Sequence, residues 1–430
     1  MLLSDNTKLW YVNRMSTANS NHTVTWFRCD GYFSGAVFHG AHWIGCEGGR
    51  IVAIRDTPPR GEPVIADHAR CFAIPLLADT HVHFYLQPWP VAPAQRTPPG
   101  DKPFETEVTD AIARVKLALA DGIGFLRDLG DPHGINLEVR RRLSGDPSGA
   151  PELQAAGAGI HRPKKYGRFL GVMRESIPQI KEAIDQFVAE QQVDLIKLVT
   201  TGIVNFEEKR VKQTPQFTIA ELTDLVAYSH TKGKKVAVHC SGADGLEIAI
   251  AAKVDFIEHA YFITEAQLSQ LVAGGLYWTP TLAPVHAQGF EPDTGWNTDV
   301  RRNISEILTE HNRMIARGVS CGAKILAGTD AGSPGVAMGR GLRTELACLA
   351  RSGLPPEALL AMATEGAARA CETKFYTGRI AVGQPASFGL YTEAPWQSIE
   401  HLDSLVEVYS NGERVDREPM NEPMAAILNS

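Results

Sequence analysis

The sequence predicts an α/β protein in which a (β/α)₈ barrel carries a small β-sandwich domain formed by both ends of the chain. Three observations lead to this prediction. Between about residues 75 and 369, eight short apolar runs alternate with longer amphipathic stretches. Both flanks are instead rich in Gly, Val and aromatic residues, with glycine turns typical of hairpins. The chain has 430 residues, 44% hydrophobic and 21% charged, so it can bury a large core.

The apolar runs have the length of buried strands, and the stretches between them have helical periodicity. Continuously apolar strands that alternate with helices predict a parallel sheet covered on its outside, and eight such units predict a TIM barrel. The runs are Ala73–Ala78, Ile123–Leu129, Leu153–Ala158, Asp194–Val199, Lys235–His239, Asp255–His259, Leu276–Leu282 and Lys324–Asp330. The clearest helices are Val108–Ala120, Ile177–Gln191, Ile219–Lys232, Gly245–Ala252, Glu265–Ala273 and Ile304–Arg317. Glycine stops are expected at Lys232-Gly233 and Arg317-Gly318.

The flanking segments predict the second domain. The N-terminal flank contains Glu47-Gly48-Gly49-Arg50 before the apolar Ile51-Val52-Ala53-Ile54, and the C-terminal flank contains Asn411-Gly412. Both are hairpin signals. We therefore expect residues 22–74 and 377–418 to pair into one small β-sandwich domain, and residues 75–376 to form the barrel.

Composition and charge argue against several classes of function. Lys and Arg total 42 and Asp and Glu total 49, so the formal net charge is −7, a poor match to the phosphate backbone of nucleic acid. No apolar run approaches the roughly 18 residues of a membrane helix, and the first twenty residues lack a signal-peptide stretch. We expect a cytoplasmic protein without a nucleic-acid or membrane partner. The seven cysteines are scattered, without a CxxC pair, and are expected to be buried thiols.

Two histidines follow the first apolar run. His81 and His83 are at positions i and i+2, so on a strand their side chains share one face. At the carboxyl end of a barrel strand that face points toward the axis, where two imidazoles can bind one metal ion. The HxH pattern alone is more often packing than metal binding. Its position at a strand end favours the metal.

Four more residues with suitable chemistry lie at the ends of later runs or within them. Lys197 has apolar neighbours in its run, where an ammonium is costly unless its charge is removed or paired. His239, His259 and Asp330 each end a run. Each residue alone is compatible with an ordinary hydrogen-bonded side chain or a turn. Because the carboxyl ends of barrel strands meet at one mouth, we expect all of them to converge there with the HxH pair.

With these residues in this order, the chain resembles the metal-dependent amidohydrolase superfamily, and within it the branch with prolidase-like and Xaa-Arg or Xaa-Lys dipeptidase-like members. The resemblance runs from about residue 30 to residue 415. The segments that carry it are Pro75-Leu76-Leu77-Ala78-Asp79-Thr80-His81-Val82-His83, Arg127-Asp128-Leu129-Gly130, Asp194-Leu195-Ile196-Lys197, Val238-His239, Ile257-Glu258-His259-Ala260, Thr279-Pro280-Thr281-Leu282 and Gly328-Thr329-Asp330-Ala331-Gly332.

The resemblance implies a centre of two divalent metal ions. The implied ligands are His81, His83 and Asp330 for one ion, His239 and His259 for the other, and an N-carboxylated Lys197 that bridges both. Capture of carbon dioxide needs a neutral amine, and burial depresses a lysine pKa. Zinc is the expected metal, with manganese, cobalt and iron as alternatives that the same ligands accept.

The implied function is hydrolysis of a C–N bond, an amide or peptide-like bond in a small molecule, by a water activated between the two ions. Asp330 would be the catalytic residue that takes the proton of the attacking water and passes it to the leaving amine. The same centre could instead hydrolyse a lactone, a carbamate or urea, or a phosphoester. A metal-free relative could serve as a catalytically inactive assembly protein, which metal analysis would reveal. A homo-oligomer is also open.

Substrate contacts are expected from two residues near later strand ends. His161 and Tyr261 resemble positions at which relatives contact the substrate carboxylate or carbonyl. The segment His161–Arg168 is strongly basic, and is either a solvated loop or an anchor for an anionic group of the substrate. Arg127 and Asp128 are expected to form an internal support pair.

Overall fold

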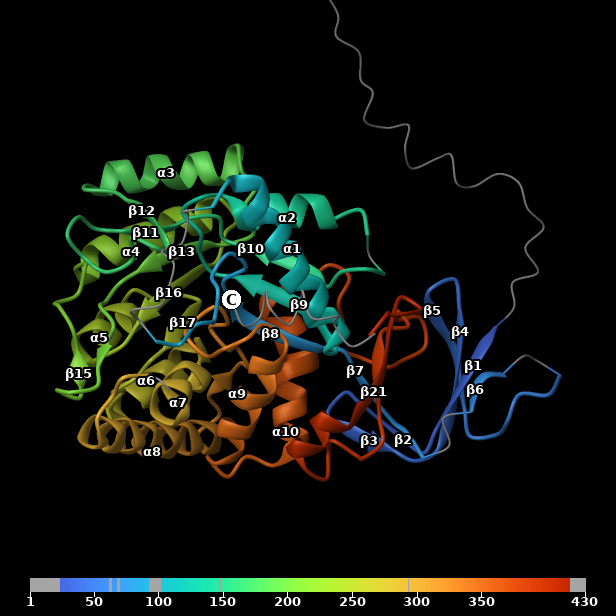
Figure 1. Ribbon diagram of the computed structural model, residues 1–430. Coiled ribbons are helices and arrows are strands. Elements are labelled where there is room, and N and C mark those ends of the chain that lie inside the picture. Colours follow the sequence, from blue (N-terminus) through green and yellow to red (C-terminus); the bar gives the residue numbers. More distant parts are fainter. Residues whose placement is uncertain are drawn as a thin grey trace, which may run out of the picture.

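The computed structural model describes residues 24–61, 64–67, 70–92, 102–146, 148–292 and 294–417 (Figure 1). A large body of parallel strands and helices carries a smaller all-β region at one side, where strands from both ends of the chain lie together. Residues 22, 23 and 418, at the expected domain boundaries, lie outside the described residues. The boundaries stay predictions.

Two sheets make up the small β region. The strand order is β5-β4-β1-β6 in one and β22-β21-β20-β7-β2-β3 in the other. β7 pairs with β20 antiparallel, with Ala73 opposite Leu390, so segments from both ends of the chain share one sheet. The strands are β1 Thr25–Cys29, β2 Gly31–Ser34, β3 Val37–His39, β4 His42–Glu47, β5 Arg50–Arg55, β6 Val64–Asp67, β7 Phe72–Pro75, β20 Phe388–Tyr391, β21 Leu405–Ser410 and β22 Glu413–Arg414.

Both hairpin turns that the sequence predicts are present in this region. Gly48 and Gly49 connect β4 to β5 with φ of +57° and +79°. Asn411 and Gly412 connect β21 to β22 with φ of +49° and +80°. A two-residue loop with positive φ at both positions matches the twist of paired strands, which explains the choice of Gly and Asn.

One buried hydrophobic cluster joins the two sheets. The ring of Phe27 in β1 lies 5.4 Å from that of Phe388 in β20 and 4.7 Å from that of Tyr409 in β21, measured between ring centroids. Other members are Cys29, Tyr32, Ile44, Cys46, Ile51, Cys71, Ala73, Ile380, Ala386 and Leu390. The shared cluster supports the prediction of a β-sandwich formed by both chain ends.

Parallel strands form the larger body, in the orders β10-β9-β8 and β12-β11-β13-β16-β17-β18-β19. Backbone hydrogen bonds connect these two sheets: Asp194 donates to Ala155 at 3.0 Å beside β10, and Asp330 donates to His81 at 2.7 Å beside β8. Each predicted apolar run contributes one of these strands. The strands are β8 Leu77–Val82, β9 Ile123–Asp128, β10 Glu152–Ala155, β11 Gly159–His161, β12 Gly171–Met173, β13 Ile196–Val199, β16 Val236–Cys240, β17 Phe256–His259, β18 Tyr277–Thr279 and β19 Lys324–Ile325, with a separate hairpin of β14 Val204–Asn205 and β15 Arg210–Val211.

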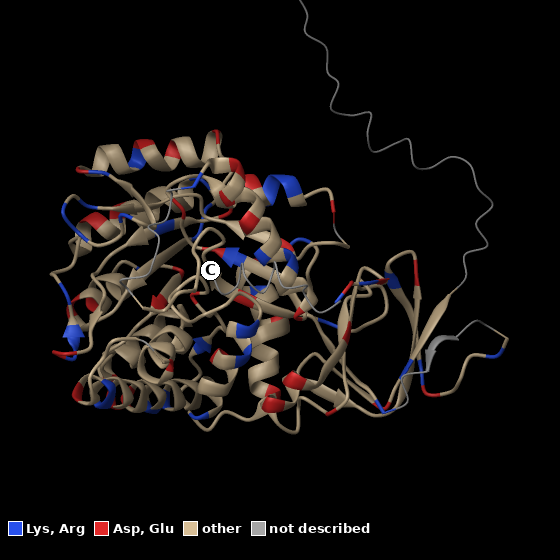
Figure 2. Ribbon diagram, viewed as in Figure 1, with Lys and Arg blue, Asp and Glu red and all other residues tan. Residues whose placement is uncertain are grey.

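Helices cover the outside of these strands (Figure 1). Capping boxes begin α3, α4 and α6, where Ser176, Thr218 and Thr264 accept from a backbone N–H in the first turn. Helix α3 carries one Lys together with a Glu and an Asp (Figure 2). The helices are α1 Phe104–Ala120, α2 Ile135–Leu143, α3 Ile177–Ala189, α4 Ile219–Thr231, α5 Ala243–Ala251, α6 Glu265–Gly274, α7 Leu282–Phe290, α8 Thr298–Ser320, α9 Arg340–Ala350, α10 Pro356–Ala361, η2 Met362–Gly366, α11 Ala367–Cys371 and η3 Ile399–Ser404. Of the helices described, none has the length and apolar character needed to span a membrane.

Two strand predictions differ from the structure. Ala73–Ala78 is divided, because Phe72–Pro75 pairs within the small β region and the barrel strand begins only at Leu77. The third run also ends early: β10 stops at Ala155, and after Gly157, whose φ of +65° breaks the extended backbone, the chain continues as β11 in the other parallel sheet. Apolar content alone marks neither break.

The glycine stop at Lys232-Gly233 is present, since Gly233 has φ of +70° just after α4. The predicted end of a helix at Arg317-Gly318 is wrong. Helix α8 continues to Ser320, and the left-handed residue is Gly322, with φ of +85°. Gly318 serves packing instead, because a Cβ there would lie 3.3 Å from the Cβ of Ala323.

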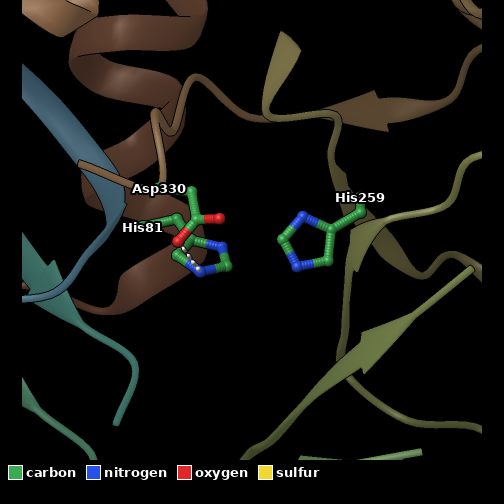
Figure 3. A group of neighbouring side chains, drawn as sticks. All are labelled: His81, His259 and Asp330. Atoms are coloured by element: carbon green, nitrogen blue, oxygen red, sulfur yellow. Dashed lines mark ion pairs between the residues drawn. The ribbon is translucent and has the colours of Figure 1, made fainter. Parts of the chain in front are cut away.

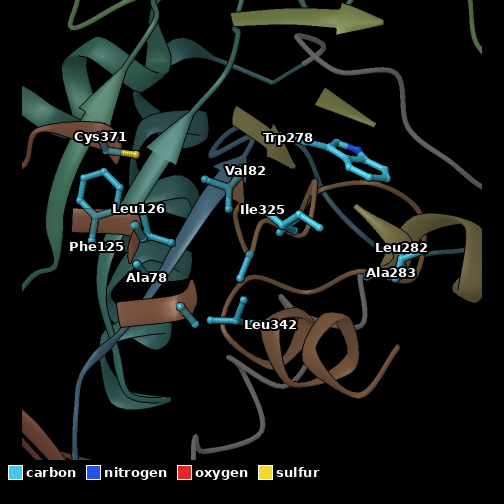
Figure 4. Close-up of a cluster of buried hydrophobic side chains, with 14 of the residues drawn as sticks. Ala78, Val82, Phe125, Leu126, Trp278, Leu282, Ala283, Ile325, Leu342 and Cys371 are labelled. Atoms are coloured by element: carbon cyan, nitrogen blue, oxygen red, sulfur yellow. The ribbon is translucent and has the colours of Figure 1, made fainter. Parts of the chain in front are cut away.

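The main hydrophobic core lies between these strands and their helices. Figure 4 shows Val82 and Leu126 on neighbouring strands, with Trp278 and Ile325 across the core and Leu342 of α9 beside them. These side chains are all at most 5% exposed. Close packing of this kind holds the strand ends, and the polar groups they carry, in fixed positions.

Candidate metal centre

The ends of β8 and β17 and the segment after β19 bring three predicted ligands together. Figure 3 shows His81, His259 and Asp330 pointing into a common space, with His259 facing the other two. Their ligand atoms lie within 4.8 Å of one another. His83 joins them: its Nε2 lies 3.1 Å from Oδ1 of Asp330, and Nε2 of His81 lies 3.4 Å from the same oxygen. Three imidazoles and a carboxylate oxygen form a donor set that suits a divalent transition metal.

Gly328 explains how Asp330 comes so close to β8. A Cβ at position 328 would lie 2.9 Å from the Cβ of His81, closer than real Cβ atoms approach other carbons. Glycine therefore lets the last strand segment run directly against the HxH strand. The backbone N–H of Asp330 then donates to the carbonyl of His81 at 2.7 Å, which fixes the carboxylate beside both histidines.

Glu258 of β17 orients His81. Its Oε2 accepts from Nδ1 of His81 at 2.9 Å, and its Oε1 lies 3.3 Å from Nη2 of Arg127. Burial opposes ionisation of Glu258, but the facing His81 and Arg127 outweigh burial and lower its pKa to about 2. A carboxylate that holds Nδ1–H leaves the Nε2 lone pair of His81 available to a cation.

Main-chain carbonyls orient two further histidines. Nδ1 of His83 lies 2.9 Å from the carbonyl oxygen of Gly130, and Nε2 of His239 lies 3.3 Å from that of Gly202. Because a carbonyl oxygen only accepts, each of these nitrogens must donate. The lone pair is therefore on Nε2 in neutral His83 and on Nδ1 in neutral His239.

Thr281 orients His259. Its hydroxyl donates to the carbonyl of Pro280 at 2.8 Å and so accepts from Nδ1 of His259 at 2.6 Å. The rings of His259 and His239 lie 4.5 Å apart, which brings His239 into the same group. His259, Thr281 and Asp330 have φ of +73°, +50° and +54°, a region that side chains other than Gly rarely adopt. Backbone strain of this kind collects at functional sites.

Lys197 lies on β13 with 1% of its surface exposed, and its Nζ has no hydrogen-bond partner among the residues that the structure describes. Burial lowers the pKa of Lys197 to about 8, so the neutral amine is far more populated near pH 8 than that of an ordinary lysine. Its charge also contributes to lowering the pKa of His239 and His259. A buried amine that lies close to these imidazoles fits a metal centre if the amine is N-carboxylated. The carboxylate added to the amine then provides a ligand for the metal ions.

The electrostatics keep His239 and Asp330 in the protonation states that metal ligands need, whereas burial lowers the pKa of His83 but the facing Asp330 outweighs burial and raises it. Burial and then the charge of Lys197 lower the pKa of His239 to about 3, so its imidazole is neutral. Burial works against ionisation of Asp330, but His81 and His83 outweigh it and hold the pKa of Asp330 well below its ordinary value. Neutral imidazoles and an ionised carboxylate are the ligand forms.

The two expected substrate contacts lie in different surroundings. His161 ends β11, is 5% exposed, and its Nδ1 lies 2.9 Å from the carbonyl oxygen of Arg162. Tyr261 follows β17 and is buried; its ring stacks on His311 at 4.1 Å and its hydroxyl donates to the carbonyl of Thr281 at 3.2 Å. Their roles toward a substrate stay predictions.

Arg127 and Asp128 have separate partners rather than one another. The Nε of Arg127 donates to the carbonyl of Thr80 at 2.7 Å. Asp128 accepts from the backbone N–H of Phe84 at 2.6 Å and from Asn136 at 2.6 Å. Both residues support the ends of the first two barrel strands.

Sequence reasoning missed two residues that orient the histidines. Glu258 carried a usable signal, because it is a charged residue inside the apolar strand β17, as Lys197 is in β13. Thr281 carried none, since a threonine after a proline is ordinary in any loop. Only its contact with His259 reveals its part in the site.

Comparison with known proteins agrees with this geometry. The profile of the Amidohydrolase family matches residues 72–415, which include every predicted ligand. An uncharacterised protein of Mycobacterium tuberculosis is 25% identical over 359 residues, covering 82% of this chain and 88% of that protein. The chain belongs to the metal-dependent amidohydrolases and is a hydrolase of C–N bonds that uses a divalent metal.

Solved structures share the fold. A Xaa-Pro dipeptidase with bound methionine superposes with a TM-score of 0.78 at 22% identity, covering 91% of this chain and 99% of that chain. The ochratoxinase of A. niger gives 0.77 at 16% identity, covering 93% and 97%. Phenylurea hydrolase B gives 0.72 at 18% identity, covering 92% and 97%. These proteins have the TIM-barrel fold in common with this chain.

Proposed function

We propose that this protein hydrolyses an amide or peptide-like bond of a small molecule at a centre of two divalent ions, with zinc as the expected metal. His81, His83 and Asp330 would hold one ion, and His239 with His259 the other. When bound, the ions supply an activated water and polarise the scissile carbonyl. Lys197, N-carboxylated, would bridge the pair.

The observation that carries the proposal is the buried Lys197 amine, which has no hydrogen-bond partner in the described part of the chain. A buried ammonium that nothing pairs costs several kcal/mol, so such a residue is retained for a function. Carboxylation turns the amine into an anionic oxygen donor. Carboxylation removes the free-energy cost of a buried ammonium. It also adds a metal ligand on a side chain longer than that of Asp or Glu.

Asp330 is the proposed proton carrier. It is ionised, it lies against His81 and His83, and it follows the last barrel strand, where catalytic residues of barrels collect. It would take a proton from the attacking water and deliver it to the leaving amine. Because water is the nucleophile, the reaction needs no Ser or Cys nucleophile. His161 and Tyr261 are proposed to contact the substrate near this point.

A substrate screen with the metal-loaded protein tests the proposal. The panel contains N-acyl amino acids, dipeptides, lactones and carbamates, assayed with zinc, manganese, cobalt and iron in turn. Turnover of amides or dipeptides above lactones and carbamates is the expected result. Turnover restricted to lactones or carbamates would reassign the bond, and a protein that binds less than about a tenth of an equivalent of metal would be an inactive relative.

A further inference from the structure

The segment that leaves β11 at His161 and runs as a loop to Arg168 places an aromatic ring against the candidate metal centre. The ring of Tyr166 lies 5.0 Å from the ring of His239 and 5.5 Å from that of Phe169. The loop is the basic segment of the sequence, yet two of its cations are engaged within the protein. Arg162 pairs with Glu221 at 2.6 Å, and Lys165 donates to the hydroxyl of Thr214 at 2.8 Å.

The segment after β15 holds this loop by its backbone. The side chain of Gln216 accepts from the N–H of Arg162 at 2.8 Å and donates to the carbonyl of Tyr166 at 2.8 Å. The side chain of Gln213 accepts from the N–H of Tyr166 at 3.1 Å. Both backbone polar groups of Tyr166 are therefore fixed, which is unusual for a loop residue and sets where its side chain lies.

Two other contacts set the loop close to the strand ends. The hydroxyl of Tyr85, which follows the HxH strand, donates to the carbonyl of Phe169. Gly167 has φ of +125°, and a Cβ there would lie 2.9 Å from the Cβ of His161 and 3.0 Å from Cγ2 of Val199 at the end of β13. The loop backbone thus lies directly on the strand that carries Lys197.

The hydroxyl of the partly buried Tyr166 differs from those of three buried tyrosines. Tyr85, Tyr261 and Tyr376 all donate to backbone carbonyls, whereas the Tyr166 hydroxyl has no hydrogen-bond partner within the described ranges. Burial and then the charge of Asp330 raise the pKa of the Tyr166 phenol, so the hydroxyl stays protonated and lies in the field of the centre. It is a neutral donor, held in place and not used by the protein itself.

We propose that the Tyr166 hydroxyl donates a hydrogen bond to the oxygen of the scissile carbonyl as negative charge develops there during attack by water. The inference rests on the proposed amide hydrolysis. The proton stays on Tyr166 throughout, so the residue stabilises the oxyanion and takes no part in proton transfer. A preorganised donor of this kind is worth most in the transition state, because the carbonyl oxygen carries little charge before attack.

Tyr166→Phe tests this role, because it keeps the ring against His239 and removes only the hydroxyl. With the best amide or dipeptide substrate from the panel, kcat is expected to fall about 100-fold, while KM changes less than about threefold. Metal content and thermal midpoint should match those of the wild type. Tyr228→Phe is the matched control: Tyr228 bonds Asp185 on the outer helices, and its loss should leave kcat unchanged.

The outcomes separate this inference from the proposed function. Wild-type turnover with unchanged kcat in Tyr166→Phe would overturn the inference and leave the amide hydrolysis intact. Loss of bound metal in Tyr166→Phe would also overturn it, since the hydroxyl would then act on the centre and not on the substrate. Absence of any wild-type turnover of amides or dipeptides would overturn both.

Discussion

The rim of the barrel and the core of the small β region bury side chains of opposite kinds. At the rim, Lys197, Glu258 and His81 are each at most 1% exposed. In the β region the buried cluster around Phe27 and Phe388 is aromatic, aliphatic and thiol. Burial of the first kind costs stability unless every group is paired, whereas burial of the second kind provides it. The difference teaches that the rim is arranged for chemistry and depends on the rest of the fold for its stability.

Among the variants that test this difference, Lys197→Ala should have the largest effect on activity. We expect turnover to fall on the order of 1,000-fold or more and at least one metal ion to be lost, because the bridging ligand is gone. The thermal midpoint of the metal-free protein should not fall, since an unpaired buried amine is removed. Elemental analysis, kinetics and calorimetry measure these effects, with Lys181→Ala on the exposed face of α3 as the control. Normal metal content and turnover would refute the bridge.

Phe388→Ala should give the opposite pattern. Phe388 is fully buried, and its ring contacts those of Phe27 and Tyr409. Its loss is expected to lower the free energy of unfolding by about 3–5 kcal/mol through lost transfer energy and a cavity. The kcat of the folded enzyme should be unchanged. Denaturant titration and kinetics check this, and Phe375→Ala, at a residue that is 74% exposed, should change neither quantity.

Asp330→Asn separates chemistry from binding at the rim. The amide keeps the size of the side chain but cannot take a proton, so kcat is expected to fall at least about 100-fold while KM stays within a few-fold. Steady-state kinetics on the metal-loaded variant measure both constants. Equal kcat in variant and wild type would remove Asp330 from the proton-transfer step.

Glu345→Gln should have the smallest effect of these variants. It changes how the free energy of unfolding depends on pH. Glu345 of α9 is buried, accepts from the backbone N–H of Ala283 at 2.7 Å, and has a pKa that burial raises from 4.5 to about 8. The folded state therefore binds the proton more tightly than the unfolded state. The wild type should lose stability as pH rises from about 4.5 to about 8.

Glutamine does not titrate, so the stability of Glu345→Gln relative to the wild type should rise by at least about 1 kcal/mol between about pH 5 and pH 8. Denaturant unfolding at several pH values gives this difference. A constant difference over the whole range would show that Glu345 does not hold a proton in the folded protein.

Much of this protein could be predicted from its sequence. Each of the eight apolar runs contributes at least part of a barrel strand, because the pattern of a buried strand is local. His81 and His83 had to share a face, since side chains two apart on a strand always do. Lys197 attracted notice because a charge among apolar neighbours is costly wherever it is found.

Contacts between distant segments could not be predicted in this way. The sequence does not specify that Glu258 meets both His81 and Arg127, that Thr281 holds His259, or that Gln213 and Gln216 hold the loop of Tyr166. Each contact depends on the register of parallel strands and on backbone turns with positive φ, which join residues more than a hundred positions apart in the first case. Local pattern thus determined the strands and the kinds of side chain at their ends. Closure of the barrel decided which of those groups face one another, because that depends on packing of the whole chain.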